Sequence, residues 1–147
     1  MHDGFSLPQT SWIALLSIAH RYEFLNVRER VIREIYDILP EQQDPLDSDE
    51  DHPLLVSVGE KYDVPPRHML PSLVQLVIRE QPLTPDEVSR FSALTVSRLA
   101  HAREAYVRKT VIYPEHIGWS KQIEHWKWCC GVARILVCKI WAVENDG

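Results

Sequence analysis

The hydrophobic and polar positions of residues 1–40 predict two amphipathic helices. The apolar positions of the first helix repeat at i, i+3, i+4 and i+7, and they are Trp12, Leu15, Leu16 and Ala19. Those of the second helix are Val27, Val31, Ile35 and Ile38, with charged residues on the opposite face. Asn26 and Glu29 have the spacing of a capping box and predict the start of the second helix, whereas Pro40 predicts its end.

The first helix has a copy further along the chain. Residues 15–24 (LLSIAHRYEF) align with residues 55–64 (LVSVGEKYDV), since in both an apolar stripe leads to a cation, a tyrosine, an acid and a final hydrophobe. A fainter third copy lies at residues 96–104, where residues 99–101 (LAH) match residues 18–20 (IAH). Helical units repeated in this way predict helix pairs that stack to share one core.

Proline and capping signals divide the middle of the chain into further helices. Pro53 predicts a helix that runs to Tyr62, and the proline pair at 65–66 predicts a break. The next helix is expected at residues 67–79, with its start delayed by Pro71.

A third group of helices is predicted from residue 84 onward. Thr84 with Glu87 matches a capping box, and Pro85 suits the first helical position. Val88 and Phe91 are the expected anchors of this short helix. A longer helix at residues 93–109 is expected to bury Val96, Leu99, Ala100 and Tyr106.

Residues 120–143 predict a last helix that is apolar on nearly every side. One stripe contains Trp126, Cys129, Ala133, Leu136, Val137 and Ile140, and Trp128, Val132 and Ile135 lie outside it. Such a helix requires burial on more than one side, so we expect it to close the core or to drive self-association. The candidate protein interface is Trp126, Leu136, Val137 and Ile140.

The pattern as a whole predicts an all-α fold of six or seven helices, arranged as stacked helical pairs. Residues 1–110 would form the helical region and residues 111–147 a hydrophobic C-terminal segment. Between the first two pairs, residues 41–51 contain six acids and one large apolar residue and predict a mobile surface loop. A calcium loop is the alternative there, although its glycine and distal glutamate are missing.

Composition and charge restrict the possible functions. The chain has 147 residues, a formal net charge of −5 and a pI near 5.8, which argues against broad binding to nucleic-acid phosphates. Three cysteines make a poor disulfide framework, and neither a signal peptide nor a membrane-spanning segment is apparent. We therefore expect a soluble intracellular protein, cytoplasmic or nuclear, with no membrane partner.

Few residues have the type and spacing of a catalytic or metal-binding site. Nucleophile motifs, phosphate-binding glycine loops and zinc-protease helices are missing from the sequence, so we expect no enzymatic activity and no cofactor. One group has the residue types of a zinc site, namely His116, His125, Cys129, Cys130 and Cys138. We expect these cysteines to pack as small hydrophobic residues and to hold no metal, and a zinc site is the alternative. His20 and His101, at matching repeat positions, are expected to pack or to cap helices.

Several segments together resemble one family. Residues 22–32 (YEFLNVRERVI), 61–65 (KYDVP), 80–87 (EQPLTPDE) and 100–104 (AHARE) are similar, in order and spacing, to the helical region that follows the BTB/POZ domain in fungal BTB proteins. The resemblance covers about residues 12–108. It implies an α-helical region without assigned catalytic activity, and a BTB domain would be expected to precede residue 4.

The expected function is a non-enzymatic protein–protein interaction module. The resemblance implies this role, because BTB proteins as a class mediate contacts with other proteins and with themselves. A helix-turn-helix nucleic-acid binder is an alternative, based on Arg28, Arg30 and Arg33, whose charge Glu29 and Glu34 partly neutralise. A small metal-binding protein is the other alternative.

Overall fold

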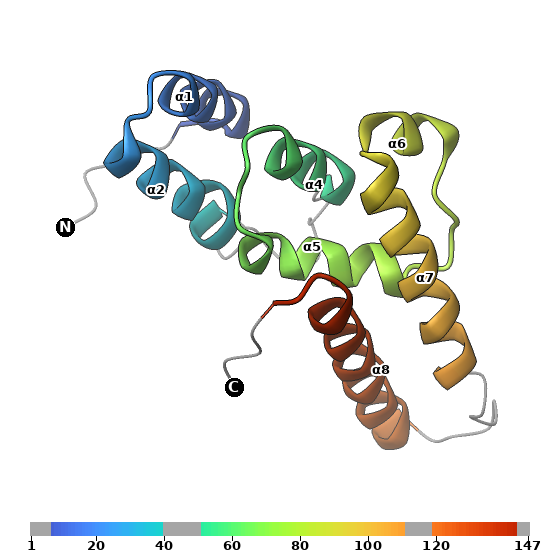
Figure 1. Ribbon diagram of the computed structural model, residues 1–147. Coiled ribbons are helices and arrows are strands. Elements are labelled where there is room, and N and C mark those ends of the chain that lie inside the picture. The colour runs from blue at the N-terminus through green and yellow to red at the C-terminus, as the bar shows by residue number, and fades with distance from the viewer. Residues whose placement is uncertain (1–6, 40–50, 111–118, 144–147) are drawn as a thin grey trace.

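The computed structural model describes residues 7–39, 51–110 and 119–143, with residues 119–126 described by their backbone alone. This part of the chain contains seven α-helices, one π-helical turn and no strand (Figure 1). The elements are α1 (Gln9–Arg21), α2 (Leu25–Arg33), η1 (Glu34–Ile38), α4 (His52–Lys61), α5 (Pro66–Ile78), α6 (Pro85–Arg90), α7 (Ala93–Thr110) and α8 (Trp119–Ile140). The predicted all-α fold of six or seven helices is confirmed.

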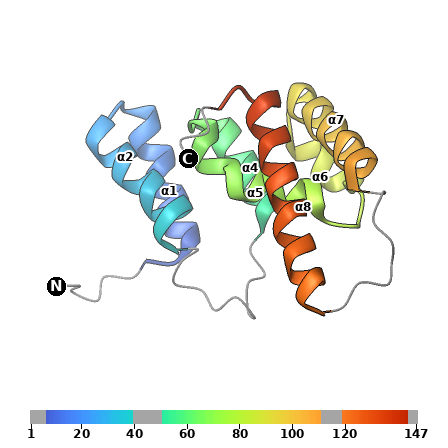
Figure 2. The same cartoon turned by 90° about the horizontal axis from the view of Figure 1, so that it is seen from below.

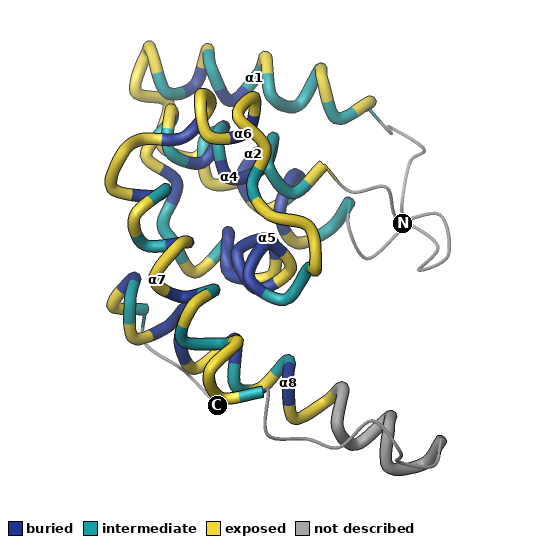
Figure 3. The backbone as a smooth tube through the Cα atoms, turned by 90° about the vertical axis from the view of Figure 1, so that its right-hand side faces the viewer, coloured by how far each residue is buried: buried dark blue, intermediate teal, exposed yellow. Residues whose placement is uncertain are grey.

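Adjacent helices pack in pairs around α5. Helix α1 lies against α2, α4 against α5, and α7 against α8, while α5 also contacts α7 and α8 (Figures 1 and 2). Helix α5 has the most buried surface, as its dark colour in Figure 3 shows. Its buried residues are Met69, Leu70, Ser72, Leu73, Val74, Leu76 and Val77. The described helices therefore share one core, with α5 at its centre.

The first two sequence copies are also copies in structure, because α1 and α4 end in the same way. In each, the acid after the tyrosine adopts a left-handed backbone, with φ 57° at Glu23 and 53° at Asp63. The amide of the next hydrophobe then donates to a carbonyl five residues back, Phe24 to Ala19 and Val64 to Gly59, both at 2.9 Å. This is the Schellman termination of a helix.

The third copy lies at a different place from the one predicted. Helix α7 continues through residues 96–104 to Thr110, and Ala100 is exposed, so the predicted third copy is wrong. Helix α8 instead ends like α1 and α4, with φ 53° at Ala142 and a 2.9 Å bond from the Val143 amide to the Cys138 carbonyl. Residues 137–143 (VCKIWAV) therefore match residues 18–24 (IAHRYEF).

The predicted start of α2 is also wrong, as is the delay that Pro71 was expected to cause in α5. Helix α2 begins at Leu25 with Phe24 at its N-cap and no side-chain cap, because the left-handed turn at Glu23 leads the chain directly into the helix. Asn26 and Glu29 therefore lie inside α2. Helix α5 begins at Pro66 and contains Pro71. The extensive burial of α5 outweighs the one backbone bond that this proline removes.

The structure confirms the predicted capping box of α6 and some of the predicted buried residues of α6 and α7. The Thr84 capping box is confirmed, because Glu87 N–H donates to Thr84 Oγ1 at 3.2 Å and Thr84 N–H donates to Glu87 Oε1 at 3.0 Å. Phe91 is buried as expected, whereas Val88 is exposed. In α7, Leu99 is buried, Val96 and Tyr106 are half-buried, and the fully buried alanine is Ala102 instead of Ala100.

Most of the predicted acidic loop lies outside the described residues, as does Pro40. Its last residue, Asp51, is the N-cap of α4, and its Oδ1 accepts from the Leu54 amide at 3.1 Å. Asp51 therefore belongs to the helix start and not to the loop.

Two arginines join helices by capping the C-termini of their neighbours. Arg28 on α2 donates through Nη2 to the Tyr62 carbonyl at 3.2 Å and to the Asp63 carbonyl at 2.8 Å. Arg103 on α7 donates to the carbonyl of Leu76 in the last turn of α5 and to that of Gln81 in the segment after this helix. A cation at this position satisfies free carbonyls and interacts favourably with the helix dipole.

Candidate protein-interaction surface

The interface residues predicted on α8 lie mostly inside the chain. Leu136 and Val137 are buried, and Ile140 is half-buried. The side chain of Trp126 is outside the described residues. Helix α8 packs on α5 and α7, so its main stripe closes the core of the chain and does not face solvent.

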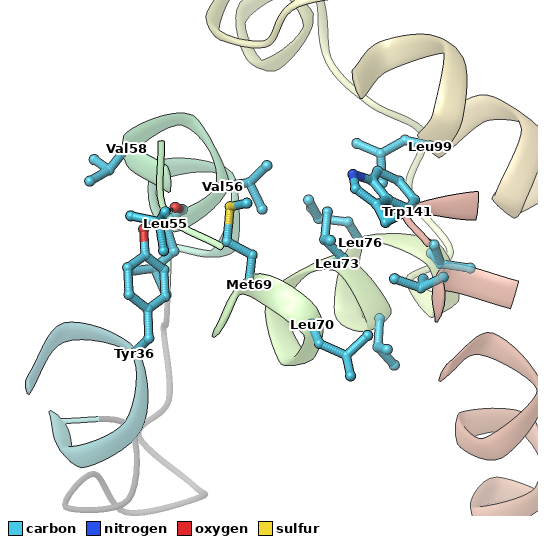
Figure 4. Close-up of a cluster of buried hydrophobic side chains, with 14 of the residues drawn as sticks. Tyr36, Leu55, Val56, Val58, Met69, Leu70, Leu73, Leu76, Leu99 and Trp141 are labelled. Atoms are coloured by element: carbon cyan, nitrogen blue, oxygen red, sulfur yellow. Dashed lines mark hydrogen bonds between the residues drawn. The ribbon is translucent and has the colours of Figure 1, made fainter. Parts of the chain in front are cut away.

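Trp141 is a core residue that the sequence analysis did not single out. It is buried at the end of α8 near Leu73, Leu76 and Leu99 (Figure 4), and the Arg98 guanidinium lies 5.8 Å from its ring centroid. The signal that could have identified it is the match with Tyr22 and Tyr62 in the other two copies.

Among the side chains that the structure describes, the largest group of exposed hydrophobic residues lies where α1 turns into α2. We name this group the corner surface, and it consists of Ile18, Tyr22, Phe24, Leu25 and Val27. Every residue from 21 to 27 is exposed, and the rings of Tyr22 and Phe24 stack with centroids 6.1 Å apart. Contiguous apolar exposure of this kind marks interaction sites in soluble proteins.

The second copy shows the same positions covered. Ile18 and Phe24 are 49% and 53% exposed, whereas their equivalents Val58 and Val64 are 7% and 4% exposed. Tyr22 is 60% exposed, whereas Tyr62 is half-buried. The two copies have the same local structure, so the difference in exposure comes from the elements that pack against each copy.

Helices α1 and α2 contact the end of the second copy at Tyr62 and Asp63. The His20 ring lies edge-on to the Tyr62 ring at 5.7 Å, and Arg28 caps the carbonyls of Tyr62 and Asp63. The equivalent carbonyls of Tyr22 and Glu23 receive no side-chain donor from the residues that the structure describes. The corner surface is thus the uncovered end of the helical stack, at the far side of α1 and α2 from α4 (Figure 1).

A smaller apolar surface remains on the outer side of α8. Trp128 and Ile135 are exposed there, and both belong to the positions predicted to lie outside the main stripe.

The groups with shifted pKa values serve packing and capping. Hydrogen bonding from Arg79 lowers the pKa of Glu87 to about 2, although burial opposes this shift. Burial, together with a hydrogen bond to Cys129, raises the pKa of Tyr106 to about 12. Of the repeat histidines, His20 packs on Tyr62 as expected, and His101 is exposed.

The predicted zinc ligands are described only in part. Cys129 and Cys138 are buried and Cys130 is half-buried, while the His116 and His125 side chains lie outside the described residues. Among the described side chains, no three histidine, cysteine or acidic residues are placed to hold a metal ion.

Comparison with known proteins gives no assignment, because no family model, curated protein or solved structure significantly matches the chain. No helix in the described ranges is long and apolar enough to cross a membrane.

Proposed function

We propose that this protein is a non-enzymatic protein–protein interaction module and that the corner surface is its docking face. One observation carries this proposal: Ile18, Tyr22 and Phe24 are exposed, whereas their equivalents in the second copy are buried or half-buried, with Tyr62 packed against His20 of α1. The exposed side chains each gain roughly 1.5 to 3 kcal/mol on full burial, which is enough for a few of them to hold a partner.

The covered copy also indicates what kind of partner fits. Arg28, in the first turn of α2, satisfies the carbonyls at the end of α4. The partner is therefore an amphipathic helix of another protein that contributes an apolar face and a basic residue to the carbonyls of Tyr22 and Glu23. The resemblance of residues 12–108 to the helical region of BTB proteins supports an interaction role on independent grounds.

The arginines of α2 favour this function over the helix-turn-helix alternative. Arg28 is bound to the end of α4, and Arg30 pairs with Glu34 at 3.0 Å. A recognition helix would need these side chains to reach base edges together in the major groove.

Site-specific photo-crosslinking in cells tests the proposal. A photoreactive residue at Leu25 is expected to crosslink a partner, whereas one at Val107, exposed on α7, serves as the matched control and is expected not to. The crosslinked partner peptide should be helical, with a basic residue near the site of attachment.

Two variants test whether the crosslink depends on the corner surface. Phe24→Glu places a charge in the corner surface and should abolish the crosslink from Leu25, while Ile135→Glu on the outer side of α8 should retain it. Circular dichroism checks that both variants remain folded. Equal crosslinking from Leu25 and Val107, or a crosslink that survives Phe24→Glu, would refute the corner surface as the docking face.

A further inference from the structure

A basic pocket of about 240 Å³ lies between α2 and the start of α5. Its walls include Arg28, Glu29 and Arg33 from α2 and Arg67 and His68 from α5, and the buried Ile32 forms part of its lining. The pocket is smaller than the usual range for drug-sized ligands or cofactors, about 300–1,000 Å³, so it suits a compact chemical group.

Three of the lining residues are arginines, and Glu29 is the one carboxylate among the lining residues. Arg28, Arg33 and Arg67 form no ion pair with any described acid. The protein is net acidic, and other arginines on its surface are paired, for example Arg90 with Asp86 and Arg108 with Glu104. The concentration of unpaired positive charge in one pocket is therefore a specific feature of this face.

Hydrogen bonds to backbone carbonyls hold one of these guanidinium groups, that of Arg28, in place. Both bonds that fix Arg28 come from Nη2, which leaves its Nη1 and Nε for another acceptor. The N-terminus of α5, whose helix dipole favours anions, borders the same pocket through Arg67 and His68. A fixed donor and a favourable dipole reduce the cost of ordering the site when an anion enters.

Two acids limit the ligands that fit. Glu29 lines the pocket, and Asp37 lies 3.6 Å from His68 Nδ1. With these carboxylates present, a singly charged ligand gains little, whereas a dianion can engage all three arginines. Arginine also matches the oxygen geometry of a phosphate group better than lysine does.

We propose that this pocket binds a phosphate monoester carried by a side chain of a partner protein. A phosphorylated serine, threonine or tyrosine presents a compact group with close to two negative charges at neutral pH. A nucleic acid fits less well, because it needs a track of positive charge and this pocket is a single basic spot on a chain of net charge −5. The pocket is a separate site from the corner surface.

Titrations of the full chain, followed by amide chemical shifts of Arg67 and His68, test this site. The probes are inorganic phosphate, a peptide with one phosphoserine and the same peptide without phosphate, all at constant ionic strength. Inorganic phosphate is expected to give saturable shifts, and the phosphopeptide to bind at least about tenfold more tightly than its unphosphorylated form. The double variant R33Q/R67Q, which leaves the Arg28 cap intact, should weaken phosphopeptide binding by at least about tenfold.

Arg134→Gln, at an exposed arginine of α8, is the matched control and should bind the phosphopeptide like the wild type. The proposal is wrong if phosphate shifts do not saturate, if both peptides bind equally, or if R33Q/R67Q binds unchanged. Tighter binding of a single-stranded oligonucleotide than of the phosphopeptide would also overturn it. None of these results affects the expected crosslink from Leu25. The phosphate pocket and the corner surface can therefore be refuted independently.

Discussion

Gly59 on α4 lies against the side chain of Met69 on α5. A β-carbon at Gly59 would collide with the Met69 sulfur, and it would lie 3.2 Å from the Tyr36 hydroxyl (Figure 4 shows Met69 and Tyr36). The equivalent residue of the first copy is Ala19, which is fully buried. The glycine is therefore required by the packing of α4 on α5 and not by the end of the helix itself.

Gly59→Ala should destabilise the protein by about 1–2 kcal/mol, measured by urea unfolding. Overpacking of a core costs about 1–3 kcal/mol, and the better helix propensity of alanine returns up to about 1 kcal/mol. In a Met69→Ala background the added methyl group has room, so the same substitution should be neutral or stabilising. An equal loss in both backgrounds would show that Met69 is not the cause.

The sequence predicted those features that depend on neighbours along the chain. The two copies at 15–24 and 55–64, and the Thr84 capping box, are local patterns, and the structure contains both. It did not predict the third copy at 137–143, because Ala142 replaces the acid that marks the other two. What the three ends share is the left-handed residue and the spacing of the hydrophobes around it.

The candidate surface could not be predicted from local sequence for a related reason. Tyr22 and Tyr62 have nearly the same neighbours along the chain, yet only Tyr62 has a helical pair in front of it. The apolar stripe of α8 correctly indicated a need for burial. Only the packing of α8 on α5 and α7 shows that the burial of Leu136 and Val137 occurs within the chain.

Low pH should reduce the folding stability of the protein, because it protonates the Glu87 carboxylate. Its carboxylate pairs with Arg79 at 2.8 Å and completes the Thr84 capping box, and its pKa is about 2 instead of 4.5. Because the folded-state pKa is lowered, this stabilisation is complete above pH 4.5 and is lost as the pH falls from 4.5 toward 2. Glu87→Gln should cost about 1–2 kcal/mol at pH 7 and should flatten the loss of stability between these pH values.

The matched control for that experiment is Glu104→Gln. Glu104 pairs with Arg108 one turn away on the exposed face of α7, so its removal should cost less than about 0.5 kcal/mol. Urea unfolding at pH 7 and at pH 3 separates the two variants. A Glu87→Gln protein with the acid sensitivity of the wild type would exclude Glu87 as its source.

Glycine at the left-handed helix ends should stabilise the protein. Ala142 and Glu23 adopt φ 53° and 57°, a conformation that costs a non-glycine residue about 1–2 kcal/mol. Part of this gain is offset by the greater freedom of glycine in the unfolded chain. Ala142→Gly and Glu23→Gly should therefore each raise stability by about 0.5–1 kcal/mol in thermal unfolding. Ala133→Gly, in the middle of α8, should instead lower it.

Asp51 and the acids before it should respond differently to mutation. Asp51→Ala removes the side chain that caps α4 and should cost about 1 kcal/mol. Replacement of residues 41–50 with a Gly/Ser linker of equal length should leave the melting temperature nearly unchanged, because loop closure depends mainly on length. A large loss from the linker, or melting of the intact protein that depends on calcium, would assign those acids a structural or metal-binding role.

Helix α8 either closes the core of its own chain or joins two chains, and mutation distinguishes these two roles. Trp141 is buried among leucines of α5 and α7, so Trp141→Ala should cost about 3–5 kcal/mol, with a matching shift in the unfolding midpoint. A chain that ends at residue 118 loses the whole buried stripe of α8, including Ala133 and Val137, and exposes the facing side of α5. It should therefore unfold or aggregate, as shown by circular dichroism and light scattering. If the shortened chain stays folded and differs only in becoming monomeric, α8 acts between chains, and its packing on α5 is not what stabilises the fold.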